Sequence, residues 1–179
     1  MLELDDLIVP YNSFGGDWEA FNEAIYEYFC EDFIVDSPCY RKQEVGIKKW
    51  DKEDGKEGTY WHVTSEDPKH TPRGYNRKGR TQDIKRSERI RWIREIIENP
   101  TDTSIKRWVE KIQGQDRHHL WYNDEFIVVL SEHPSYPYFR LVTAFYVRDK
   151  ERDWYEQKFQ KYGQKKGDAA VATSYPYKP

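Results

Sequence analysis

The first 40 residues contain no lysine and no arginine, although the chain of 179 residues carries 29 of them against 32 carboxylates. Positive charge is concentrated instead between Lys69 and Arg94, where only Asp83 and Glu88 are acidic. An asymmetry of this kind suggests that the basic segment binds an anion, with nucleic acid as the first candidate. Mutual neutralisation of the acidic and basic parts within the fold explains the same pattern equally well.

Cysteine is scarce too, and no long apolar run is present. Cys30 and Cys39 are the only cysteines, and their spacing matches neither a metal site nor a redox motif, so reduced thiols are expected. No stretch is apolar enough to span a bilayer, and the acidic N-terminus lacks the basic start of a signal peptide. These absences predict a soluble, cytoplasmic protein without a membrane partner.

Several catalytic and cofactor motifs are missing from the sequence. There is no phosphate-binding glycine loop, no nucleophile elbow and no zinc motif. His118 and His119 are adjacent, so on a strand they point to opposite sides and cannot readily chelate one ion. We therefore expect no metal and no cofactor, which leaves histidine, arginine and threonine as the residues available for chemistry.

The strongest structural signal is the segment 124–147, which contains two apolar runs, Phe126–Leu130 and Tyr138–Val147, joined by a proline-rich connection. A third run, 119–122, precedes them across Asn123-Asp124, a tight-turn dipeptide. These runs predict an antiparallel meander.

The segments around the meander have mixed signals. Helical spacing after Asp17 and from 83 to 98 predicts two helices, and 148–166 predicts a third. Residues 58–64 have the composition of a strand, 45–47 suggest a short strand, and 105–112 are ambiguous between strand and helix. We predict one α+β domain over 1–166, with an acidic helical part (1–40), a sheet-containing part (41–147) and a C-terminal helix (148–166). A polar loop over 66–81 and a flexible tail over 167–179 complete the prediction.

His62 is the first candidate for chemistry, because a histidine titrates near neutral pH and can serve as a general acid or base. It lies between Trp61 and Val63, and a histidine in such a run is more often a hydrogen-bonded structural residue. Both alternatives stay open from the sequence.

Arg89 and Arg91 lie close together at a predicted helix start, and guanidinium groups suit phosphate through permanent charge and bidentate hydrogen bonds. They serve equally well as a solvated face paired with Glu88 and Glu95. Thr143 lies among apolar neighbours on the last predicted strand, and it offers either a donor to a phosphate oxygen or a structural hydrogen bond.

The order of these elements resembles a known group. Residues 60–66 (YWHVTSE), 87–100 (SERIRWIREIIENP), 121–130 (WYNDEFIVVL) and 141–147 (LVTAFYV) resemble segments of phage- and prophage-encoded proteins of the barnase, EndoU, colicin and RelE-like nuclease group, in particular its RlfA-like members. The resemblance covers roughly residues 1 to 160. It implies an α+β fold with one or two helices packed on a curved antiparallel sheet, and a metal-independent ribonuclease activity with His62, Arg89 and Thr143 at the motif positions.

The leading hypothesis from the sequence is a cytoplasmic, phage-related RNA endonuclease of a bacterial host cell. His62 would be the acid or base, Arg89 and Arg91 the phosphate clamp, and Thr143 the oxyanion donor. The residues expected to hold the RNA backbone are Lys85, Arg86, Lys106 and Arg117. The alternative is a non-catalytic phage accessory module that binds nucleic acid, a host protein or an antagonist protein. An enzyme should bring His62, Arg89 and Thr143 into one cleft, whereas a binding module should present a flat basic or aromatic surface.

Overall fold

The computed structural model describes residues 1–66, 81–134 and 138–163. Residues 67–80 of the predicted polar loop and the predicted C-terminal tail lie outside these residues, while the two ends of the loop, Glu66 and Thr81, are in strands. The helices are η1 (Asp5–Leu7), η2 (Tyr11–Phe14), α1 (Trp18–Cys30), η3 (Glu31–Val35), α2 (Gly58–Thr64), α3 (Ile84–Glu88), α4 (Trp92–Glu98) and α5 (Asp149–Tyr162). The strands are β1 (Cys39–Tyr40), β2 (Gln43–Gly46), β3 (Ser65–Glu66), β4 (Thr81–Gln82), β5 (Ile105–Ile112), β6 (Gln115–Tyr122), β7 (Phe126–Glu132) and β8 (Phe139–Tyr146).

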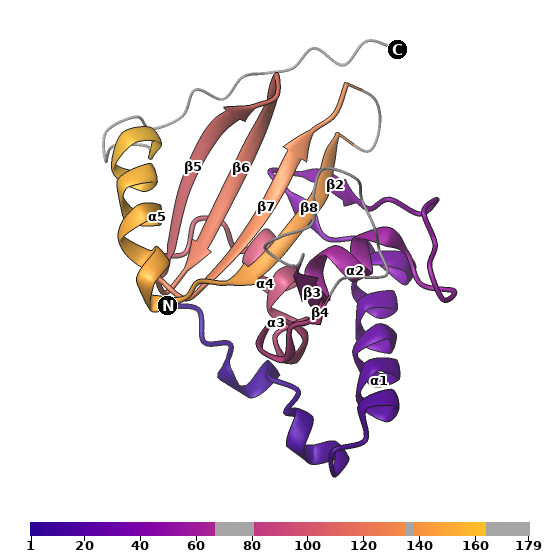
Figure 1. Cartoon of the computed structure of the whole chain (residues 1–179). Coiled ribbons are helices and arrows are strands. Elements are labelled where there is room, and N and C mark those ends of the chain that lie inside the picture. Colours follow the sequence, from indigo (N-terminus) through magenta and orange to yellow (C-terminus); the bar gives the residue numbers. More distant parts are fainter. Residues whose placement is uncertain (67–80, 135–137, 164–179) are drawn as a thin grey trace.

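The fold is α+β, as predicted: N-terminal helices, a strongly curled six-stranded sheet and a C-terminal helix (Figure 1). The sheet order is β1-β2-β8-β7-β6-β5, and β6 to β8 form the predicted antiparallel meander. Residues 105–112, which were ambiguous between strand and helix, form β5, which extends the meander by pairing antiparallel with β6. The sheet is mixed, because β2 pairs in parallel with the start of β8. Asn123 and Asp124 both adopt positive φ, which these residue types tolerate, and they turn the chain between β6 and β7.

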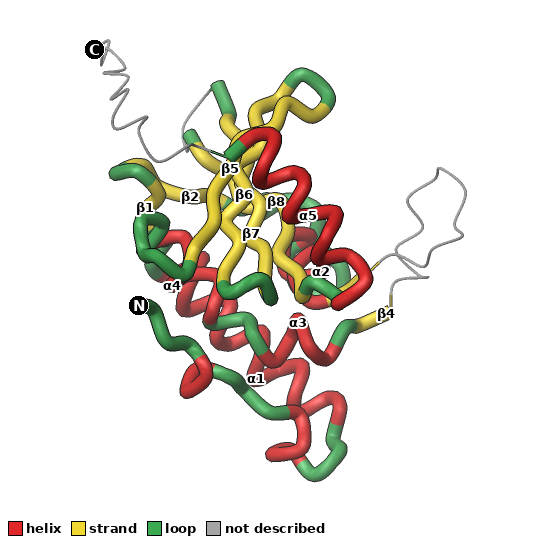
Figure 2. Tube along the Cα trace, turned by 90° about the vertical axis from the view of Figure 1, so that its left-hand side faces the viewer, coloured by secondary structure: helices red, strands yellow, loops and turns green. Residues whose placement is uncertain are grey.

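The sheet has two apolar faces, each with its own cluster of buried side chains. We call inner the face that packs against α1, α2 and α4 and that carries Leu120, Val128 and Leu130. The outer face carries Trp108, Trp121, Ile127 and Val129, and α5 packs on it. In both views α5 runs alongside the strands and is well separated from α1 (Figure 1, Figure 2).

The predicted N-terminal helix is present, and its local signals explain its bounds. The Asp17 carboxylate accepts a hydrogen bond from the Ala20 amide at 3.0 Å and caps α1. Phe21, Ile25 and Phe29 follow at helical spacing and are fully buried in the inner cluster. The aromatic stripe is therefore core, with the acidic residues on the outside.

Two local expectations were wrong. Residues 58–64 form helix α2 rather than a strand, because Tyr60 packs edge-on against Tyr26 and Phe29 of α1, and this packing overrides its β propensity. The predicted helix over 83–98 is divided into α3 and α4. At Arg89 the backbone leaves the helical region with φ −103° and ψ 20°.

Candidate functional site

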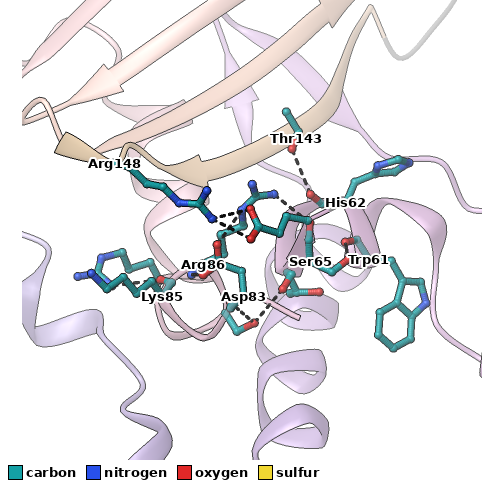
Figure 3. A network of polar contacts seen from close by, with 12 residues as sticks. Trp61, His62, Ser65, Asp83, Lys85, Arg86, Thr143 and Arg148 are labelled. Atoms are coloured by element: carbon teal, nitrogen blue, oxygen red, sulfur yellow. Dashed lines mark hydrogen bonds and ion pairs between the residues drawn. The ribbon is translucent and has the colours of Figure 1, made fainter. Parts of the chain in front are cut away.

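Thr143 and His62, two residues of the predicted catalytic set, are joined by a hydrogen bond between the Thr143 side chain and the His62 backbone. The Thr143 hydroxyl donates to the carbonyl oxygen of His62 at 3.1 Å, while the His62 imidazole points away from Arg86 and Arg148 (Figure 3). Thr143 lies beside a register shift between β7 and β8, along the part of β8 that β2 leaves unpaired. The contact therefore fastens α2 to this part of β8.

Arg89 is held by other parts of the fold. Its guanidinium forms an ion pair with Glu125 at 3.0 Å and donates to the Lys85 carbonyl oxygen at 3.1 Å. It also lies over the rings of Trp92 and Tyr146, with its Cζ atom 4.9 and 5.1 Å from their centroids. None of these contacts joins Arg89 to His62 or Thr143. The catalytic roles of the three residues therefore stay a prediction.

Most of the predicted RNA-binding residues have partners within the fold. Arg86 donates to the Ser65 carbonyl oxygen at 2.9 Å and lies 3.5 Å from the Asp83 carboxylate. Lys106 forms ion pairs of 2.7 Å with Asp124 and with Glu156.

Two further cations of the basic segment lie over aromatic rings. Lys85 lies over Tyr146, with its Nζ atom 4.6 Å from the ring centroid. Arg91 lies over Tyr28, with its Cζ atom 4.8 Å from the ring centroid. Within the described part of the basic segment, much of the charge is thus engaged inside the molecule. Lys85 also borders a cleft of about 520 Å³. The charged residues that line this cleft are the carboxylates Glu66, Asp83 and Asp149 and the cations Lys85 and Arg148. The excess of carboxylates disfavours an anionic ligand.

A second groove, of about 350 Å³, lies on the outer face between the sheet and α5. We call it the outer groove. Strands β5 to β8 provide its floor, and Trp154, Tyr155 and Lys158 of α5 provide its wall. Two residues of the predicted set, Arg117 and Thr143, border it. The floor residues are Trp108, Glu110, Ile112, Arg117, His119, Val129, Val142, Thr143 and Phe145.

The strand register explains why these side chains meet. Trp108 is paired with His119, His119 with Val129, and Val129 with Thr143, so this row crosses the sheet on one face. The neighbouring row begins with Glu110 paired with Arg117. A row of cross-strand neighbours brings together residues that are far apart in sequence.

Arg117 is the unpaired cation of the groove. No ion pair or side-chain hydrogen bond of its guanidinium is present among residues 1–66, 81–134 and 138–163. Its cross-strand neighbour Glu110 is instead engaged by Lys158. Burial lowers the pKa of Arg117, with no carboxylate to offset it, although an arginine stays charged at any physiological pH. A half-buried guanidinium without a carboxylate partner favours an anionic ligand.

Trp108 and His119 stack on each other beneath the outer groove, and both side chains are buried. Their rings are stacked, with centroids 4.7 Å apart and planes 3° apart. The indole N–H of Trp108 is buried and has no hydrogen-bond partner in the described part of the chain. A buried donor without a partner is costly to stability.

His119 is neutral, and its tautomer follows from its contacts. Nδ1 lies 3.2 Å from the Arg117 carbonyl oxygen, which can only accept, so Nδ1 carries the proton and Nε2 does not. Burial lowers the pKa of His119 to about 4. The ring therefore presents an acceptor nitrogen at neutral pH.

The sequence did not identify Trp108, His119 or Trp154 as site residues. The alternation of residues along 105–112 and 115–122 could have shown which residues share a face of the sheet. It could not have shown how the strands pair or where α5 packs, because both depend on long-range contacts.

No protein-family model, curated protein sequence or solved structure matches the chain. Among residues 1–66, 81–134 and 138–163, no helix is long and apolar enough to cross a membrane. The same residues contain no cluster of three or more histidine, cysteine or acidic side chains that would hold a metal ion.

Proposed function

We propose that this protein binds single-stranded RNA in the outer groove. The observation that carries the proposal is the unpaired, half-buried Arg117 in a groove that is also lined by the aromatic side chains of Phe145, Trp154 and Tyr155. Single strands expose bases that stack on aromatic rings, and their phosphates pair with arginine. Trp154, which is 52% exposed on the wall of the groove, offers an accessible ring.

The polar groups of the groove favour RNA over DNA. The bare Nε2 of His119 is an acceptor, and the 2′-hydroxyl of RNA is a donor that DNA lacks.

Fluorescence anisotropy with a labelled oligouridylate tests the proposal. Arg117→Gln should weaken binding, because the variant loses the groove's unpaired cation, and Trp154→Ala should weaken it by the loss of one stacking surface, worth about 1–3 kcal/mol. Lys150→Gln, at an exposed position in the first turn of α5, is the charge-matched control. Failure of the parent protein to bind RNA at low salt, or equal binding by parent and Arg117→Gln, would refute the proposal.

A metal-independent RNA endonuclease of phage origin, acting in the host cytoplasm, is the second candidate. Thr143 of the predicted catalytic set and Arg117 of the predicted RNA-binding set border the same groove. In this mechanism the 2′-hydroxyl attacks the phosphorus atom, with His62 as acid or base and the arginines at the phosphate. A non-catalytic accessory role, with a host or antagonist protein as partner, is the alternative to catalysis.

The endonuclease proposal predicts that RNA is cleaved in the presence of chelator and that the products carry 2′,3′-cyclic phosphate ends. His62→Ala should lower the rate by about 10²–10⁴-fold, the usual contribution of a general acid or base. Activity that disappears with EDTA and returns with a divalent ion would point to another mechanism. RNA binding without any cleavage would leave the binding proposal standing alone.

A further inference from the structure

A second arginine lies on the outer face, on the same row as Arg117. Arg117 is paired with Ser131 of β7, and Ser131 is paired with Arg140 of β8. Paired residues point to the same face, so Arg117, Ser131 and Arg140 form a line across three strands. Two strand spacings separate the arginine backbones, which is about 9–10 Å.

Arg140 also has no ion pair or side-chain hydrogen bond within the described residues. Its guanidinium instead lies over the ring of Trp50, with 5.4 Å between Cζ and the ring centroid. Trp50 is 63% exposed, the largest exposed fraction of the aromatic side chains described. An exposed indole next to an unpaired guanidinium contributes little to the core. The pair is suited to a nucleotide, because the indole can stack on the base and the guanidinium can bind the phosphate.

The two arginines contact different surroundings. Arg117 borders the outer groove, whereas Arg140 lies over Trp50, which follows β2 on the far side of β8. Their charged ends therefore lie in separate places on the outer face. Ser131, the residue between them, is small and uncharged, and Glu110, the carboxylate at the end of this row, is engaged by Lys158.

We propose that Trp50 and Arg140 form a second nucleotide subsite, so that a single strand crosses β6, β7 and β8 from the outer groove to Trp50. The inference rests on the proposed RNA binding and adds the path of the strand. It predicts that a mononucleotide occupies only the outer groove, whereas an oligonucleotide contacts both subsites.

The test compares uridine monophosphate with octauridylate on the full chain. Trp50→Ala should weaken octauridylate binding roughly 5- to 150-fold, the loss of one stacked base, and should leave uridine monophosphate unchanged. Trp50→Phe keeps a stacking ring and should retain most of the affinity. Arg140→Gln should weaken octauridylate alone, while Lys150→Gln controls for the loss of one positive charge.

The outcomes separate the subsite from the function. Octauridylate binding that depends on Arg117 but is unchanged in Trp50→Ala and Arg140→Gln would overturn the second subsite and leave RNA binding intact. An absence of binding in the parent protein would overturn both. Because Trp50 is exposed, Trp50→Ala should melt at the temperature of the parent, and this measurement confirms that the folded variant was tested.

Discussion

At the residue scale, the hydroxyl of Thr143 has a structural partner, and this predicts a cost in stability when the hydroxyl is removed. Thr143→Val leaves the His62 carbonyl oxygen without its donor, so the free energy of unfolding should fall by about 1–2 kcal/mol. Thr143→Ser keeps the donor and is the matched control. Urea denaturation of the three proteins measures the difference, and a Thr143→Val protein as stable as the parent would exclude a structural role for this hydrogen bond.

His119 predicts a pH dependence of stability with a definite sign. Its pKa is lowered to about 4 in the folded protein from 6.5, because burial disfavours the charged ring. Between these values the unfolded chain binds a proton that the folded protein does not, so stability falls as pH falls, by about 1.4 kcal/mol per pH unit. Below pH 4 both states are protonated, and the loss is complete.

His119→Gln isolates this contribution. Between pH 7 and pH 5 the free energy of unfolding of the parent should fall by about 2 kcal/mol more than that of the variant, as measured by urea denaturation. The size follows because pH 5 lies about 1.5 units below the pKa of the unfolded chain. Asp32 acts in the opposite direction, since burial raises its pKa to about 6, but it is present in both proteins and cancels. Parallel pH profiles of parent and variant would contradict the assignment of His119 as a neutral buried ring.

At the element scale, α5 is held more loosely than the strands beneath it. None of its residues is fully buried, whereas the second half of β6 and nearly all of β7 are. Hydrogen exchange followed by mass spectrometry should show the α5 amides opening at a lower free energy than those of β6 and β7. Protection of α5 equal to that of the central strands would show that the helix unfolds only with the whole molecule.

The elements that the sequence predicted are those with strong local signals. The meander follows from β-branched and aromatic runs bounded by turn residues, and α1 from an N-cap followed by apolar residues at helical spacing. Helix α2 was missed because Tyr60 and Val63 favour strands until α1 packs on them. The break between Glu88 and Trp92 was missed because Ile90, which lies within it, keeps helical spacing with Ile93 and Ile97.

At the scale of the whole molecule, the candidate site depends on strand pairing. Arg117 and His119 lie on β6 and Thr143 on β8, with β7 between these two strands, and their proximity is decided by register and by a shift between β7 and β8. The sequence named Arg117 and Thr143 as residues for nucleic acid. It did not show that they share a groove with Trp108, because long-range pairing leaves no local pattern.

The net charge of −3 makes RNA binding a local property of the outer face, and this predicts its salt dependence. Each phosphate neutralised by a cation contributes a slope of about −0.7 to the plot of log affinity against log salt concentration for single strands. Arg117→Gln combined with Arg140→Gln should therefore reduce the slope by about 1.4. An unchanged slope would show that the RNA is held by other cations.

Ultraviolet cross-linking of oligouridylate to the protein, followed by peptide mapping, tests the central claim most directly, because it reports where the RNA lies. The account predicts cross-links in the peptides of the outer face, those that carry Trp108, His119 and Trp154, and weaker cross-links in Arg117→Gln. Cross-links confined to peptides of α1, or of the basic residues around α3, would contradict it.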